Sequence, residues 1–341
     1  MAAITLDPSL GLQQTSKDPR GVVIEEIDGL IRVYQDGRVE RPQIVPCVTS
    51  ALAPDICVTS QDMVIDKVTN IWARFYVPMK CQGRLPLLVY FHGGGFCVGS
   101  ASWSCYHEFL AKLAAKSNCL IMSVNYRLAP ENPLPAAYDD GFEALVWLKN
   151  QALYGPSQWW STHCNFSSIF LAGDSAGANI AHNVATRLNS NNACKATALK
   201  PLGFKGTILI QPFFGGEART QSEKYVAQPS RSALSLVASD TYWRLSLPCG
   251  ANRDHPWCNP MAKGSIKLEE PRILPTLVCI SEMDILRDRN MEFCAALASA
   301  GKRVEYVVYK GVGHAFQVLN KSPLSQTRTH EMMSHIKEFI S

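Results

Sequence analysis

A serine between two glycines gives the chain a candidate nucleophile. Gly173-Asp-Ser-Ala-Gly177 follows an apolar run over 169–172 and precedes a helical pattern over 178–185. A sharp turn from strand to helix holds a serine hydroxyl out at the edge of a sheet, and glycines on either side let the two elements approach closely. This context predicts that Ser175 acts as a nucleophile.

A serine hydroxyl reacts poorly at neutral pH, so it needs a base and an acid that orients the base. In proteins with this turn the acid follows the serine along the chain, and the histidine follows the acid. Asp284 comes just after a predicted buried strand over 274–280, and His314 follows a predicted strand over 303–309 and two glycines. Alone, Asp284 would be a helix cap and His314 a structural histidine. Their order and their places after strands predict a triad of Ser175, His314 and Asp284.

Three consecutive glycines offer the backbone N–H groups that such a reaction needs where negative charge develops. His92-Gly-Gly-Gly-Phe96 follows a predicted apolar strand over 85–91. This arrangement is typical of the oxyanion loop of lipases and esterases. We expect the oxyanion to be bound by the N–H groups of Gly93, Gly94, Gly95 and Ala176.

The same glycines could instead cradle a phosphate. A dinucleotide-binding loop that began at Gly93 would need a glycine where this chain has Val98, and no Gly-x-x-x-x-Gly-Lys motif follows. Nucleotide binding is therefore disfavoured, and we expect neither a cofactor nor a metal.

Strands alternate with helical patterns along most of the chain. Besides the strands named above, apolar runs predict strands over 72–77, 120–125 and 206–211. Such alternation predicts an α/β fold with a mostly parallel central sheet and helices on both faces.

One stretch, 217–260, interrupts this alternation, and we interpret it as a small helical cap inserted into the core. The core then consists of residues 46–216 and 261–341, and the N-terminal segment 1–45 contributes to the cap. Within that segment, helical amphipathicity predicts a helix over 22–31, followed by a strand over 31–34 and a turn at Asp36 and Gly37.

Several motifs of the chain occur together in one group of proteins. They are His92–Phe96, Tyr126–Glu131, Leu134–Asp140, Gly173–Gly177, Asp284–Asp288 and Gly313–Phe316, joined by Phe213–Glu217, Trp243–Pro248 and Arg253–His255. On these motifs the chain resembles the plant carboxylesterases of the hormone-sensitive-lipase-like α/β-hydrolase family. The resemblance extends over about residues 22–340.

The resemblance implies an α/β-hydrolase fold with a small helical cap, no metal, and hydrolysis of small-molecule carboxylic esters through an acyl-enzyme. The family's triad corresponds to Ser175, Asp284 and His314, and its oxyanion donors correspond to the Gly93–Gly95 loop and Ala176. The chain departs from the family at Asn132, where members often have histidine. This difference is expected to affect a loop more than the chemistry.

The same family also includes hormone receptors that lack the catalytic histidine, and dehydratases and cyclases with an altered or repurposed site. His314 disfavours a receptor, whereas a biosynthetic lyase, cyclase or dehydratase stays open from the sequence. Three acidic residues near the motifs, Glu131, Asp139 and Asp174, are interpreted as structural hydrogen-bonding groups.

The composition is that of an ordinary globular protein. Of 341 residues, 47% are hydrophobic and 18% are charged, and the net charge is only +4. The chain has no basic stripe for nucleic acid and no apolar run long enough for a membrane span. The N-terminus lacks the pattern of a secretory signal, so we expect a protein of the cytoplasm, with the nucleus as a second location. The cysteines are expected to be free thiols, and the protein to be a monomer or a weak homodimer.

Overall fold

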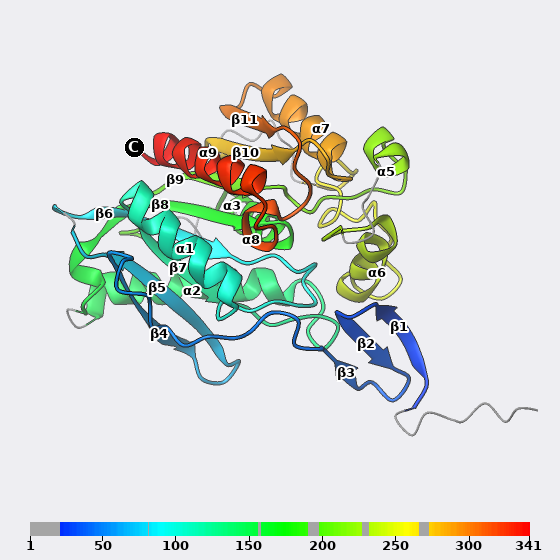
Figure 1. Ribbon diagram of the computed structural model, residues 1–341, viewed down its shortest axis with the longest axis horizontal. Coiled ribbons are helices and arrows are strands. Elements are labelled where there is room, and N and C mark those ends of the chain that lie inside the picture. Colours follow the sequence, from blue (N-terminus) through cyan, green and yellow to red (C-terminus); the bar gives the residue numbers. More distant parts are fainter. Residues whose placement is uncertain (1–20, 81, 156–157, 190–197, 227–231, 266–272) are drawn as a thin grey trace, which may run out of the picture.

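An eight-stranded sheet forms the centre of the protein (Figure 1). The computed structural model describes residues 21–80, 82–155, 158–189, 198–226, 232–265 and 273–341. The strands of this sheet are β4 (Val58–Asp66), β5 (Ile71–Pro78), β6 (Leu85–Phe91), β7 (Leu120–Asn125), β8 (Cys164–Asp174), β9 (Phe204–Ile210), β10 (Thr276–Ser281) and β11 (Val304–Tyr309).

The strands lie in the order β11-β10-β9-β8-β6-β7-β5-β4. β5 runs antiparallel to its neighbours β4 and β7, and every other neighbouring pair is parallel. The carboxyl ends of the parallel strands therefore meet at one edge of the sheet. The predicted α/β fold with a mostly parallel sheet is confirmed.

Both faces of the sheet are covered by helices, and the central strands are accordingly apolar on both sides. In β6, Leu87 and Val89 belong to the core on one face, whereas Leu88 and Tyr90 belong to the core on the other. The first core includes side chains of α2 (Ala136–Tyr154), α3 (Ala176–Asn189), α6 (Leu236–Ser246) and α7 (Arg287–Ser299). Three others contribute to the second, namely α1 (Ser104–Ser117), α8 (Phe316–Leu319) and α9 (Pro323–Ile340).

The helix predicted over 22–31 is wrong. This segment forms β1 (Val23–Ile27), which pairs antiparallel with β2 (Ile31–Tyr34), and β3 (Val39–Glu40) completes a separate small sheet. β-Branched residues favour extended backbone. Gly29, whose φ is +69°, lies in the tight turn between the two strands and so breaks any helical continuation. The predicted strand over 31–34 is confirmed.

The stretch 217–260 contains α5 (Gln221–Tyr225) and α6 (Leu236–Ser246). Figure 1 shows α6 next to the small N-terminal sheet. The two are joined by an ion pair in which Arg244 of α6 lies 2.9 Å from Glu25 of β1. Within the described part of the chain, no helix combines the length and the apolar character that crossing a bilayer requires.

Candidate active site

Ser175 lies in the turn between β8 and α3, at the carboxyl edge of the sheet. Its φ of +53° is unusual for a residue with a side chain, and its carbonyl accepts a hydrogen bond from the N–H of Phe213. The backbone leaves no room for a side chain at the flanking glycines. A Cβ at Gly177 would lie 1.9 Å from the carbonyl oxygen of Phe91. Backbone packing thus forces the serine into a strained turn and presents its hydroxyl.

The three residues predicted to act together lie within hydrogen-bond distance in series. His314 Nε2 is 2.8 Å from Ser175 Oγ, and His314 Nδ1 is 2.7 Å from Asp284 Oδ2. All three side chains are buried. Ser175 follows β8, Asp284 follows β10 and His314 follows β11, so the parallel sheet brings three distant segments to one edge.

Asp284 controls the protonation of His314. Burial disfavours the charged imidazole, but the negative charge of Asp284 and its hydrogen bond outweigh that effect. The pKa of His314 is consequently raised above 6.5. The carboxylate also accepts a hydrogen bond from the N–H of Leu286 at 3.0 Å, which holds it at the start of α7.

The loop of three glycines adopts a conformation that side chains would prevent. φ is +111° at Gly94 and +57° at Gly95. A Cβ at Gly94 would lie 2.1 Å from the carbonyl oxygen of Val98, and a Cβ at Gly95 would lie 2.3 Å from the ring of Tyr242 in α6. The N–H groups of Gly94 and Gly95 donate to no other group among the described residues.

Gly93 differs from the expectation that it would be an oxyanion donor. Its N–H donates to the hydroxyl of Tyr106 at 2.8 Å and to Asp174 Oδ1 at 3.0 Å, so it is already occupied. The N–H of Ala176 has no partner among the described residues. The groups left for an oxyanion are therefore those of Gly94, Gly95 and Ala176.

Asp174 links the serine turn to the glycine loop, in the structural role predicted for it. Besides Gly93, it accepts hydrogen bonds from the hydroxyls of Tyr90 at 2.8 Å and Tyr106 at 3.0 Å. Burial raises the pKa of Asp174 to about 6, although these hydrogen bonds oppose the shift. The carboxylate accepts three hydrogen bonds and holds the loop against the serine turn.

The other two acidic residues predicted to be structural form ion pairs. Glu131 lies 2.5 Å from Arg41, and Asp139 lies 2.6 Å from Arg187. Neither lines the cavity that contains Ser175.

A cavity of about 290 Å³ opens over Ser175 and His314. Its walls come from the glycine loop, from the N-terminal sheet and from α6, and they include Asp28, Leu30, Ile44, Trp103, Phe213, Leu234, Tyr242 and Leu319. A small apolar cavity with a few polar groups at one end is typical of a site for a small molecule.

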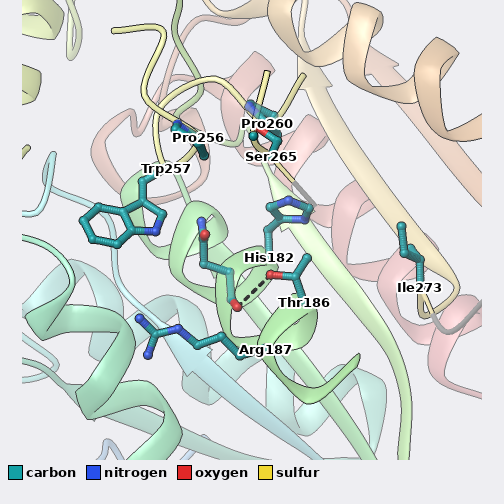
Figure 2. A pocket seen from close by; sticks show the side chains of 10 residues that line it. His182, Thr186, Arg187, Pro256, Trp257, Pro260, Ser265 and Ile273 are labelled. Carbon is teal, nitrogen blue, oxygen red and sulfur yellow. Dashed lines mark hydrogen bonds between the residues drawn. The ribbon is translucent and has the colours of Figure 1, made fainter. Parts of the chain in front are cut away.

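A second cavity, of about 170 Å³, lies along α3 away from this site (Figure 2). His182, Thr186 and Arg187 face Pro256 and Trp257 there. Burial lowers the pKa of His182 to about 4, so its imidazole is neutral. Neither Ser175 nor His314 lines this cavity, and we assign the chemistry to the first one. Across the described residues, no three His, Cys, Asp or Glu side chains gather as metal ligands.

Two groups that support the site escaped prediction from the sequence. The first is Gln211, which is fully buried at the end of β9. Its Oε1 accepts the N–H of Ala315 at 2.6 Å, and its Nε2 donates to the hydroxyl of Ser281 at 2.7 Å. It thereby holds the backbone directly after His314. A polar residue ending an apolar strand was the one sequence signal for it.

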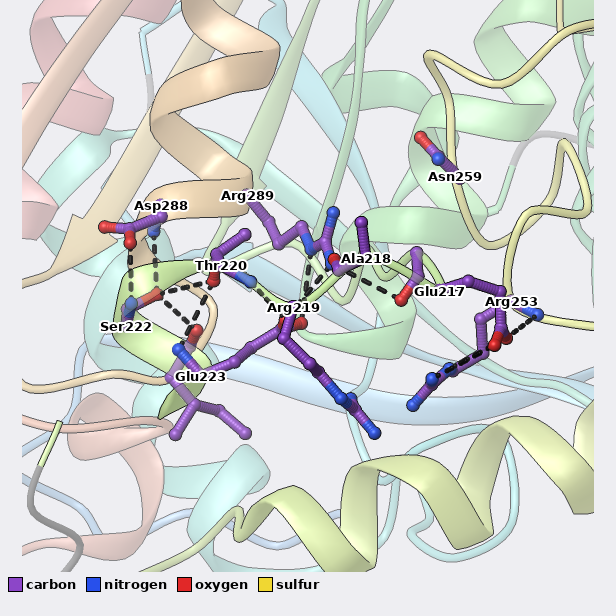
Figure 3. Close-up of polar contacts among 12 residues, drawn as sticks. Glu217, Ala218, Arg219, Thr220, Ser222, Glu223, Arg253, Asn259, Asp288 and Arg289 are labelled. Atoms are coloured by element: carbon purple, nitrogen blue, oxygen red, sulfur yellow. Dashed lines mark hydrogen bonds and ion pairs between the residues drawn. The ribbon is translucent and has the colours of Figure 1, made fainter. Parts of the chain in front are cut away.

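The second group fastens the segment that carries Asp284 (Figure 3). The hydroxyl of Ser222 donates to the carbonyl of Ile285 at 2.7 Å, and its N–H donates to Asp288 at 2.6 Å. Arg289 and Glu223 form a buried ion pair at 3.1 Å. Because these partners lie more than 60 positions apart, no local pattern could predict them.

Comparisons with known proteins agree with the fold described above. The family profile of the alpha/beta hydrolase fold matches residues 88–318. Probable carboxylesterase 6 of Arabidopsis thaliana is 55% identical over 327 residues, which cover 94% of this chain and 92% of that protein. Carboxylesterase 20 of the same plant is 35% identical over 89% of this chain and 93% of its own length. A hyperthermophilic esterase from the archaeon Pyrobaculum calidifontis superposes with a TM-score of 0.67 at 27% identity, covering 83% of this chain and 84% of that one.

Proposed function

Since the chain belongs to the plant carboxylesterases of the hormone-sensitive-lipase-like α/β-hydrolase family, we propose that it hydrolyses carboxylic esters of small molecules through an acyl-enzyme. The observation that carries this function is the unbroken series of hydrogen bonds from Asp284 through His314 to Ser175, at the base of an apolar cavity.

Acylation begins when Nε2 of His314 takes the proton of the Ser175 hydroxyl and the oxygen attacks the ester carbonyl carbon. The carbonyl oxygen becomes negative and receives hydrogen bonds from the N–H groups of Gly94, Gly95 and Ala176. Each such donor contributes about 3 kcal/mol of transition-state stabilisation. The tetrahedral intermediate then expels the alkoxide, which His314 protonates, and the alcohol leaves.

Deacylation repeats these steps with water. His314 takes a proton from the water, the hydroxide attacks the acyl carbon, and Ser175 leaves with the proton returned by His314. The carboxylic acid is released, and the enzyme is restored. Asp284 keeps the imidazole in the tautomer that accepts at Nε2 and stabilises its positive charge throughout.

We propose that the small N-terminal sheet and the stretch 217–260 act together as the cap over this site. Leu30, in the turn between β1 and β2, and Tyr242 of α6 line the same cavity as Ser175. We also propose that the protein is located in the cytoplasm, with the nucleus as a second location. We propose further that it is a monomer or a weak homodimer.

The test combines labelling with mutant kinetics. An organophosphate is expected to add once, at Ser175, as shown by the intact mass and by peptide mapping. Ser175→Ala and His314→Ala should each lower the turnover of simple esters by about 10³-fold or more, and the double variant should be little worse because the residues act as a unit. Mass spectrometry of the products should find the free acid and the alcohol in equal amounts.

Three outcomes would contradict the proposal. Turnover by the parent that is no faster than by Ser175→Ala would overturn ester hydrolysis and favour a binding protein. Substrate consumption without release of the acid would indicate a lyase or cyclase instead. An adduct on any residue other than Ser175 would overturn the assignment of the nucleophile.

A further inference from the structure

The cavity over Ser175 has aromatic and aliphatic walls. Trp103, Phe213 and Tyr242 contribute rings, and the rings of Phe213 and Tyr242 meet edge to face at 6.3 Å. Tyr242 is only 4% exposed, and its hydroxyl has no partner among the described residues. This hydroxyl is therefore available to a ligand as a donor and as an acceptor. Such walls accept apolar groups, and aromatic faces also attract organic cations.

Within the described part of the cavity lining, the charged side chains besides His314 are carboxylates. Asp174 lies at its base, and Asp28, in the turn between β1 and β2, lines the part formed by the N-terminal sheet. Asp284 adds a third negative charge behind His314. Among the described residues that line the cavity there is no lysine or arginine. A cleft with charges of one sign and apolar walls focuses their field on whatever enters.

Two arginines on the surrounding elements are held in ion pairs of their own. Arg32 of β2 is paired with Glu26 at 2.6 Å, and Arg244 of α6 is paired with Glu25 at 2.9 Å. Asp28, in contrast, has no ion-pair partner among the described residues. Among the described residues at the exposed side of the cavity, Asp28 thus carries a negative charge without an ion-pair partner.

We propose that the site selects esters by charge: it accepts neutral and cationic esters, it disfavours anionic esters, and Asp28 sets this preference. The inference rests on the proposed ester hydrolysis and adds the class of substrate. The substrate has a small apolar acyl group and an alcohol that is uncharged or carries a quaternary or primary ammonium group.

Three butyrate esters of similar size test this proposal. They are 3,3-dimethylbutyl butyrate, its cationic counterpart butyrylcholine, and the anionic 2-sulfoethyl butyrate. Release of butyric acid is followed at about pH 8, where Asp174 with its pKa of about 6 is ionised. In each enzyme, kcat/KM for the two charged esters is divided by kcat/KM for the neutral one, which cancels general effects on catalysis.

The variants change one charge at the cavity. Asp28→Asn should lower the butyrylcholine ratio by about threefold, and Asp28→Lys should lower it by about tenfold and raise the sulfoethyl ratio by a similar factor. Asp36→Asn is the matched control, because this exposed residue lies in the next turn of the same small sheet and outside the cavity. Its two ratios should equal those of the parent. The differences should shrink between about 20 mM and about 0.5 M NaCl.

The outcomes separate the two proposals. Equal ratios in the parent, Asp28→Asn and Asp28→Lys, with the esters still hydrolysed, would overturn charge selection and leave the hydrolase intact. If none of the esters is hydrolysed and the organophosphate does not label Ser175, ester hydrolysis is overturned and charge selection with it. If Ser175 is labelled although the butyrates are inert, labelling rates are compared for a cationic organophosphate and its neutral isostere. Charge selection then predicts that the ratio of the cationic to the neutral rate falls in Asp28→Asn and in Asp28→Lys, and an unchanged ratio would overturn it.

Discussion

At the scale of single residues, the chemistry depends on how Asp284 and His314 share a proton. The imidazole must be neutral to accept the proton of Ser175, yet Asp284 favours its protonated form and raises its pKa. A base whose pKa is close to the working pH is effective in proton transfer. The carboxylate therefore has an effect on rate that its orienting role alone would not produce.

Turnover is expected to fall on acidification through the pKa of His314, which lies above 6.5 because of Asp284. In Asp284→Asn the charge that raises this pKa is lost while burial still lowers it. The acid limb of the profile of kcat/KM against pH should therefore move to lower pH, and the plateau should fall by about 10⁴-fold. Initial rates between about pH 5 and 9 check both effects. An acid limb that stays in place in the variant would contradict the coupling.

Gln211 is a positioning residue for the histidine loop. Gln211→Met removes the acceptor of the Ala315 N–H, and a buried donor left without a partner costs about 1–3 kcal/mol. We expect the free energy of unfolding to fall by that amount. We also expect kcat to fall at least tenfold, with KM nearly unchanged, because a loosened His314 affects the transition state more than binding.

A matched control for Gln211→Met is Thr207→Val. This variant also removes a buried hydrogen bond from β9, between the hydroxyls of Thr207 and Thr276 at 2.8 Å. Thr207→Val should lower the free energy of unfolding by about as much as Gln211→Met does, and it should leave kcat unchanged. Equal losses of kcat in the two variants would show that general destabilisation explains the effect and that Gln211 has no positioning role.

At the scale of elements, α5 depends on α7 for its place in the fold. α5 has only five residues, too few to be stable alone, although Thr220 and Glu223 form a capping box at its start. Its attachment comes from the buried pair of Glu223 with Arg289 and from the hydrogen bonds of Ser222 to the first turn of α7 (Figure 3). The same contacts hold the segment that follows Asp284.

Removing one partner of the buried ion pair between Glu223 and Arg289 should destabilise the fold. Arg289→Met leaves Glu223 charged and without its partner, which is expected to lower the free energy of unfolding by about 3–5 kcal/mol. The double variant Arg289→Met, Glu223→Gln removes the orphaned charge and should recover part of the loss. Urea unfolding followed by fluorescence measures both values. If the loss of unfolding free energy in the double variant equals the sum of the losses in Arg289→Met and Glu223→Gln, the two residues do not interact.

At the scale of the whole molecule, burial rather than sequence position decides which cysteines can react. Cys47, Cys57 and Cys249 are exposed, whereas six of the ten described cysteines are buried, and none of the ten forms a disulfide. Burial raises the pKa of Cys97 and Cys279 to about 12, which suppresses the reactive thiolate.

Brief iodoacetamide treatment of the native protein should therefore modify Cys47, Cys57 and Cys249 and spare the buried thiols. Unfolding in urea should open the six buried positions. None of the described cysteines lines the cavity over Ser175, so the treated protein should keep its esterase activity. Peptide mapping by mass spectrometry identifies the sites. Rapid modification of Cys97 or Cys279 in the native state would contradict the packing of the core.

What the sequence determined by itself is local in origin. Periodicity and short motifs place Ser175, Asp284 and His314 in this order along the chain, each directly after a strand. Because parallel strands bring their carboxyl ends to one edge of the sheet, this order predicts that the three residues meet there. The mostly parallel sheet follows in the same way. The glycines at 94, 95 and 177 could be recognised because their backbone demands exclude other residues.

The tertiary structure decided what depends on contacts between distant segments. The N–H of Gly93 is taken by Asp174, 81 positions away, and Gln211 meets Ala315 across 104 positions. The segment 22–31 is a hairpin because β1 finds its partner in β2, which outweighs a helical pattern of apolar residues. Asp28 reaches the cavity over Ser175 for the same reason. Short motifs report local backbone geometry, whereas the free energy of a buried polar contact depends on both partners, and folding alone brings them together.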